Sequence, residues 1–150
     1  RGVCMKSLIA SLAFVAALFA VLELTRPAWS GGYGLTVEVV RIVDGDTLVV
    51  NLPCQISIVC TAMPVRLRGL DTPELKGKCP KERQAALRAQ EILKLLVLGA
   101  KTVRLERLGR DKFFRLDSDV IADGINVGAI LVKKGVARPY TGEGPRGSWC

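Results

Sequence analysis

The pattern of hydrophobic and polar positions divides the chain near residue 30. Residues 8–22 are apolar apart from Ser11, and Arg1 and Lys6 precede them. This run of 15 residues is shorter than the roughly 20 needed to span a bilayer. A charged start, a short apolar middle and the small-x-small sequence at residues 28–30 are typical of a secretory signal peptide. We therefore predict a signal peptide over residues 1–30; an uncleaved membrane anchor and a buried core helix are the alternatives.

Beyond residue 34 the pattern alternates between short β-rich stretches and two helical stretches. The predicted strands span residues 35–43, 47–52, 65–70, 101–107 and 116–122. The predicted helices span residues 80–98, followed by Gly99, and 125–134, followed by Gly135. Five short strands, a helix after the third and a C-terminal helix predict a mainly β fold, a five-stranded OB-fold barrel. A small sandwich is the alternative.

Charge and composition narrow the kind of chemistry available. The chain has 22 basic and 14 acidic residues, and residues 1–30 hold three and one of these, so residues 31–150 carry a formal charge of +6. This surplus favours a polyanion such as nucleic acid, although a basic protein without such a partner is also compatible with it. The chain contains no histidine, which excludes serine–histidine and cysteine–histidine mechanisms and histidine-ligated zinc.

Four cysteines lie outside the predicted signal peptide, at Cys54, Cys60, Cys79 and Cys150. An even number behind an export signal indicates disulfides formed in an oxidising compartment. Three pairings are possible, and we favour Cys54–Cys60, closing one loop, with Cys79–Cys150, tying the end of the sequence to the loop after residue 74. A zinc cluster would more often show C-x2-C pairs, which are absent.

Carboxylates and arginines concentrate near two predicted strand ends. Asp46 follows an Asp-Gly turn, and Asp71 and Glu74 follow the third predicted strand, which carries Arg66 and Arg68 on one face. Converging carboxylates repel one another unless a cation joins them, and hard oxygen ligands suit Ca²⁺, Mg²⁺ or Mn²⁺. The alternative is a hairpin turn at Asp46 and ordinary surface salt bridges between the other four residues.

Three motifs, in this order, resemble the staphylococcal nuclease (thermonuclease) family: IVDGDT at residues 42–47, VRLRGLDTPE at 65–74 and DKFFR at 111–115. The stretch ADGINVGAILVKKGVARPY at residues 122–140 adds to the likeness, which covers roughly residues 37–140. The resemblance implies an OB barrel with helices and a Ca²⁺-dependent phosphodiesterase acting on DNA and RNA, with another divalent cation as an alternative.

The resemblance also implies roles for particular residues. The positions that match its metal ligands are Asp46, Asp71 and the backbone carbonyl of Thr72. The positions that match its general base and its two catalytic arginines are Glu74, Arg66 and Arg115. Lys112 and Tyr140 match positions that hold substrate phosphates. The family usually has glycine before the second arginine, whereas this chain has Phe114, and Phe resists backbone angles that glycine permits.

The interpretation that combines these observations is an exported, metal-dependent nuclease. We expect a single monomeric domain over residues 31–150, in the periplasm or outside the cell, with no permanent membrane span once the signal is cleaved. Two alternatives stay open at this point: a catalytically inactive OB-fold module that binds nucleic acid, and a membrane-tethered protein with another partner.

Overall fold

The computed structural model describes residues 34–150. The predicted signal peptide and its cleavage site therefore lie outside the described residues, and the boundary at residue 30 stays a prediction. Among the helices of residues 34–150, none combines the length and the apolar character that crossing a bilayer requires.

Short strands and three helices make up the described part of the chain. The strands are β1 Leu35–Asp44, β2 Thr47–Asn51, β3 Met63–Leu67, β4 Leu70–Asp71, β5 Val103–Arg110, β6 Leu116–Ala122, β7 Ile125–Asn126 and β8 Arg138–Pro139. The helices are α2 Ser57–Cys60, α3 Pro80–Leu98 and α4 Val127–Lys133.

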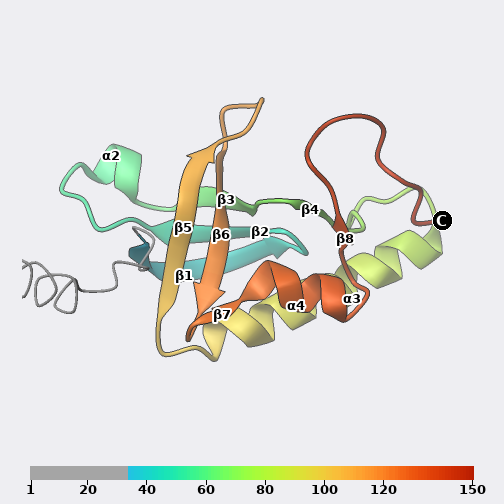
Figure 1. Ribbon diagram of the computed structural model, residues 1–150, viewed down its shortest axis with the longest axis horizontal. Helices are drawn as coiled ribbons and strands as arrows, with labels where there is room; N and C mark the ends of the chain where they lie inside the picture. The colour runs from blue at the N-terminus through green and yellow to red at the C-terminus, as the bar shows by residue number, and fades with distance from the viewer. Residues whose placement is uncertain (1–33) are drawn as a thin grey trace, which may run out of the picture. The chain divides into compact units, whose positions relative to one another are not determined.

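Five of the strands close into a barrel, as the sequence predicts (Figure 1). They follow the order β3-β2-β1-β5-β6, and β3 also pairs with β6 in parallel. The other barrel pairings are antiparallel. The parallel contact removes the last free edges of the sheet, which are the positions where a strand exposes unpaired backbone groups. The fold is thus a closed, mixed five-stranded barrel with helices, confirming the predicted class.

The third and fourth predicted strands differ most from the observed ones, whereas the first two differ by one residue at their ends and β6 matches. The third strand ends at Leu67 rather than residue 70, because Gly69 adopts a left-handed φ of 77° and turns the chain. Residues 70–71 then form β4, which pairs with β8 outside the barrel. The fourth strand runs on to Arg110, past a break in register between Glu106 and Gly109 where Arg107 has a φ of 51°. Such a bulge bends a strand without ending it.

The helices largely match the predicted positions. In α3, Pro80 stands at the first turn, the Cys79 Sγ accepts a hydrogen bond from the Glu82 N–H, and Gly99 follows the last residue. The predicted 125–134 helix is shorter, since residues 125–126 pair with β6 and the Asn126 side chain caps α4. The short helix α2 was not predicted.

Both favoured disulfides are confirmed: Cys54 is joined to Cys60, and Cys79 to Cys150. The first closes the loop that contains α2, and the second ties residue 150 to the start of α3.

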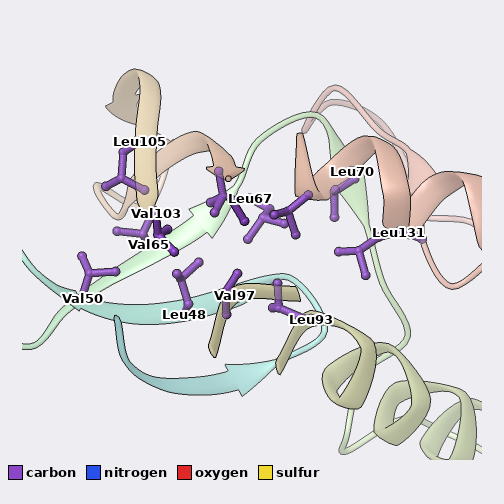
Figure 2. Close-up of a cluster of buried hydrophobic side chains, with 14 of the residues drawn as sticks. Leu48, Val50, Val65, Leu67, Leu70, Leu93, Val97, Val103, Leu105 and Leu131 are labelled. Carbon is purple, nitrogen blue, oxygen red and sulfur yellow. The ribbon is translucent and has the colours of Figure 1, made fainter. Parts of the chain in front are cut away.

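The main apolar core fills the barrel and continues beneath α3 and α4, as Figure 2 shows for Leu48, Leu67 and Leu93 among others. Because strands and helices share one core, the loops that connect them are held on a rigid base.

Candidate active site

The turn between β1 and β2 presents the first predicted metal ligand. The Asp44 carboxylate accepts a hydrogen bond from the Asp46 N–H at 3.1 Å, which closes the turn. Gly45 lies so close to its neighbours that a Cβ there would approach Ala89 to 2.7 Å and Thr72 to 3.1 Å. There is therefore no room for a side chain at this position. Glycine allows the turn to pack closely against Thr72. The residue that precedes Asp46 in the turn thus packs against the Thr72 side chain.

Asp46 is a buried carboxylate with one cationic partner. Its side chain forms an ion pair with Arg66 at 2.7 Å and accepts a hydrogen bond from the Thr47 hydroxyl at 2.8 Å. Burial raises the pKa of Asp46 to about 7; Arg66 opposes this rise, and the nearby Asp44 carboxylate adds to it. Burial disfavours the charged form of this carboxylate, and any additional cation close to it would stabilise that form.

The next two predicted ligands lie at the end of β4, where Asp71 is its last residue and Thr72 follows it. Asp71 and Thr72 are both 3% exposed, and pairing of Asp71 with Arg138 of β8 fixes the backbone there. The Asp71 Oδ2 accepts a hydrogen bond from the Trp149 indole at 3.0 Å. The Asp71 Oδ1 is buried and forms an ion pair with Arg146. The cation that this buried oxygen meets is thus the guanidinium of the chain itself.

Glu74, the predicted general base, lies on the exposed loop that leads to α3. Its side chain is 51% exposed, and Oε1 forms an ion pair with Arg146 at 2.5 Å. The loop is held from behind, because Glu82 of α3 accepts hydrogen bonds from the Lys78 N–H at 2.9 Å and from the Glu74 N–H at 3.4 Å. Glu74 therefore stands at the surface on a supported backbone, with access to water.

Arg146 is the residue of this region that sequence reasoning missed. Besides its ion pairs with Asp71 and Glu74, its guanidinium donates to the Thr72 carbonyl at 3.0 Å. Burial lowers the pKa of Arg146, but its hydrogen bonds to Glu74 and Asp71 outweigh this and raise it above the ordinary value. Its only signal in the sequence is indirect, since the favoured Cys79–Cys150 pairing already ties the neighbouring residues to the loop after residue 74.

The two arginines near the end of β3 have different partners. Arg66 joins Asp46 and also donates to the Leu70 carbonyl at 3.2 Å, next to Asp71. Arg68 makes two hydrogen bonds to Asp117, at 2.7 and 3.0 Å, and the bond with this carboxylate raises the pKa of Arg68. Arg66 thus lies with the carboxylates, whereas Arg68 joins β3 to β6.

Arg115 lies on the loop between β5 and β6 and is engaged there. Its side chain forms hydrogen bonds and an ion pair with Asp111, at 2.7 to 2.8 Å, and stands 5.3 Å from the Phe113 ring centroid. The Asp111 carboxylate also accepts the Phe113 and Arg115 N–H groups, which shapes the loop. Phe114 has a left-handed φ of 64°, so this chain adopts a glycine-like angle with a bulky residue. No contact joins Arg115 to Asp46, Asp71 or Glu74 among the interactions of residues 34–150.

The two predicted phosphate-binding residues also have partners within the chain. Lys112 donates to the Gly142 carbonyl at 3.2 Å, and the Tyr140 hydroxyl donates to the Gly144 carbonyl at 2.8 Å. Both carbonyls belong to the segment 140–150 that follows β8.

The oxygen atoms of the predicted metal site match what a hard divalent cation binds. Two buried carboxylates and a backbone carbonyl form the donor set. The described side chains do not gather these carboxylates to metal spacing, however. Within residues 34–150, the group of three ligand atoms within 4.8 Å of one another is Cys79, Glu82 and Cys150. Two of these are joined as a disulfide, and thiol ligands do not suit calcium.

Comparison with known proteins identifies the family that the chain resembles. Residues 64–148 match the family described as staphylococcal nuclease homologue. A protein of Capnoides sempervirens, described as an uncharacterized 38.1 kDa protein, is 31% identical over 101 residues, which is 67% of this chain. The chain spans only 28% of the length of that relative. The matched residues include Arg66, Asp71 and Glu74, whereas Asp46 precedes them. The chain belongs to the staphylococcal nuclease homologue family.

Proposed function

We propose that this protein is an exported nuclease that hydrolyses phosphodiester bonds in DNA and RNA with the help of a divalent cation, Ca²⁺ first among them. The observation that carries the proposal is the ion pair of Arg66 with Asp46 beside a turn whose Gly45 packs against Thr72, with Asp71 and Glu74 on the adjoining strand and loop. This composition suits a reaction on an anionic substrate in a chain without histidine.

The reaction needs a base for water and positive charge at the phosphate. Glu74 is half exposed on a supported loop, so we assign it the role of orienting and deprotonating the attacking water. Arg66 is fixed by Asp46 and by the Leu70 carbonyl, and we assign it the phosphoryl oxygens, which a planar guanidinium binds with two hydrogen bonds. A cation bound by Asp46, Asp71 and the Thr72 carbonyl would neutralise charge on the phosphate.

Arg115 is the second phosphate ligand in this proposal. Its ion pair with Asp111 lies on an exposed loop, where such a pair contributes only about 0–1 kcal/mol. Substrate phosphate can therefore compete with Asp111 for the guanidinium.

Export is supported by the two disulfides in addition to the predicted signal peptide. Disulfides persist in oxidising compartments and are rare in the cytosol. We therefore place the protein in the periplasm or outside the cell.

A comparison of Glu74→Gln with wild type tests the function. The full chain is incubated with single-stranded DNA and, separately, RNA, with Ca²⁺, Mn²⁺ or Mg²⁺ and with chelator. We expect cleavage by wild type that chelator stops, and a loss of 10²- to 10⁴-fold in Glu74→Gln, typical of a missing general base. The matched control is Glu91→Gln on the exposed face of α3, which should cleave like wild type. Intact nucleic acid under every metal condition would refute the proposal.

The pairing of Arg115 with Asp111, away from the carboxylates, favours a second candidate. In that case the barrel is an inactive OB-fold module that binds nucleic acid. It predicts salt-sensitive binding that is equal in wild type and Glu74→Gln, with cleavage by neither.

A further inference from the structure

The segment 140–150, defined as the residues that follow β8, lies on the proposed active site. Its central contact is Arg146, whose guanidinium meets Asp71, the Thr72 carbonyl at 3.0 Å and Glu74 at 2.5 Å. Two of these three groups are proposed ligands of the divalent cation, and the third is the proposed base. One side chain of the segment thus occupies the oxygen atoms on which the proposed reaction depends.

A second side chain of the segment acts on the same carboxylate. The Trp149 indole donates to Asp71 at 3.0 Å, and its ring lies 3.7 Å from the Arg138 guanidinium. Arg138 also donates to the Ser148 carbonyl at 2.9 Å. Stacking of an arginine on tryptophan is the most favourable cation–π pair, so these contacts hold the segment against β4 and β8.

The segment also contacts one of the two residues assigned to the substrate phosphates, Lys112, and contains the other, Tyr140. Lys112 donates to the Gly142 carbonyl, and Tyr140 donates to the Gly144 carbonyl. A phosphate approaching these two groups has to displace hydrogen bonds that the segment supplies. Both the metal ligands and the substrate ligands are therefore engaged at once.

The disulfide keeps the segment in place. Cys150 is bonded to Cys79, which caps the first turn of α3 a few residues after Glu74. This bond fixes residue 150 to a rigid element, so that Arg146 and Trp149 stay near the carboxylates even when their own contacts open. Such a tether raises the effective concentration of the segment at the site.

We propose that the segment 140–150 is an autoinhibitory strap that excludes the divalent cation, and that reduction of Cys79–Cys150 releases it. The proposal rests on the metal-dependent function above. A guanidinium and a metal ion cannot bind the same oxygens at once. Both are cationic and repel each other, and both bind through the lone pairs of these oxygens. The apparent metal affinity is therefore the intrinsic affinity multiplied by the fraction of molecules whose strap is open.

Release requires a dithiol reductant. One thiolate of the reductant attacks a sulfur of the Cys79–Cys150 bond, and a mixed disulfide forms while the other cysteine leaves as a thiolate. The second thiol of the reductant then resolves the mixed disulfide. Cys79 and Cys150 end as two thiols, and the reductant ends oxidised by two electrons. The strap is then held only by its polar contacts, which water and metal can replace.

The test is the affinity of the full chain for Ca²⁺ alone, measured by titration calorimetry. We expect Arg146→Ala to bind Ca²⁺ about tenfold more tightly than wild type, as it would if the strap leaves about one molecule in ten open. Cys150→Ser changes no charge, so a similar gain in this variant reports release of the strap rather than removal of a positive charge. The double variant should gain no more than the better single one.

Two controls match these changes. Arg88→Ala removes one positive charge from the exposed face of α3, and the Cys54→Ser/Cys60→Ser pair removes the other disulfide. Both should bind Ca²⁺ within twofold of wild type. A readout independent of metal is acrylamide quenching of Trp149 in a Trp29→Phe background, which leaves a single tryptophan. Quenching should rise when a dithiol is added.

Equal Ca²⁺ affinity in wild type, Arg146→Ala and Cys150→Ser would overturn the strap, and so would an absence of binding in all of them. Cleavage of DNA equally by all three would overturn the strap alone and leave the proposed function standing. A tenfold gain in affinity without cleavage by any variant would support the strap and refute the nuclease.

Discussion

Replacement of Arg68 by alanine should destabilise the fold without acting on the chemistry. Its guanidinium makes two hydrogen bonds to Asp117, at 2.7 and 3.0 Å, and the two side chains are 31% and 17% exposed. Hydrogen bonds to charged groups contribute roughly 1.5–3 kcal/mol, and exposed ion pairs about 0–1 kcal/mol. For a two-bond pair at intermediate exposure we expect a coupling free energy of about 1.5 kcal/mol. The single variant should lose about 2 kcal/mol, because Asp117 is left partly buried without its partner.

The measurement is a double-mutant cycle on Arg68→Ala and Asp117→Ala, with the free energy of unfolding taken from urea denaturation in chelator. The pair Arg107–Asp119 is the comparison, since it joins the same two kinds of residue but leaves the Arg107 side chain 68% exposed. Its coupling should fall within the error of the method. Added salt should weaken the coupling between Arg68 and Asp117.

Two results would refute this reasoning. The first is equal coupling in the two pairs, which would mean that burial and two-bond geometry do not determine the strength. The second is a loss of nuclease activity in Arg68→Ala larger than the loss of folded protein. That outcome would make Arg68 a phosphate ligand, as Arg66 is proposed to be.

Three further predictions concern the turn and the loop near the site. The raised pKa of Asp46 means that its contribution to stability is present below about pH 4 and is lost as pH rises through about 7. Asp46→Asn should therefore be more stable than wild type at pH 8 in chelator, by at most about 4 kcal/mol, and equal to it at pH 4 in urea denaturation. Gly45→Ala should lower the free energy of unfolding by about 1–3 kcal/mol and reduce cleavage, because its Cβ would press on Thr72; an unchanged variant would contradict the packing. Phe114→Gly should cost about 1 kcal/mol less stability than Phe113→Gly in thermal unfolding, because only Phe114 has a left-handed backbone that glycine relieves. A larger loss in Phe114→Gly would contradict this expectation.

Much of the fold can be predicted because its signals are local. The helix α3 begins at Pro80 and ends before Gly99, and β6 spans residues 116–122, as the pattern indicates. The missed boundaries have causes elsewhere in the chain. The third strand stops at Leu67 because β4 turns away to pair with β8. Such pairing joins residues about 70 positions apart, and no periodicity within either segment reports it.

The sequence proposes residues for the candidate site but does not indicate their partners. Asp46, Asp71 and Glu74 stand out as carboxylates at turns and strand ends, and the resemblance assigns their roles. The structure adds that Arg146 neutralises two of them. The glycine- and proline-rich sequence around Arg146 indicates this contact only indirectly, through the favoured Cys79–Cys150 pairing that brings the segment to the loop after residue 74. The choice between Arg66 and Arg68 likewise depends on Asp117, which lies 49 positions away.

The bond between Cys79 and Cys150 has a further consequence for how the molecule comes apart. It closes a covalent ring that contains α3, β5, β6 and α4. A protease that cuts the exposed loop at residues 111–115 opens this ring but does not divide the molecule, so the nicked chain runs as one species on a gel without reductant and as two with it. The β5–β6 hairpin can thus be severed at its tip while both of its strands remain linked to the same helix.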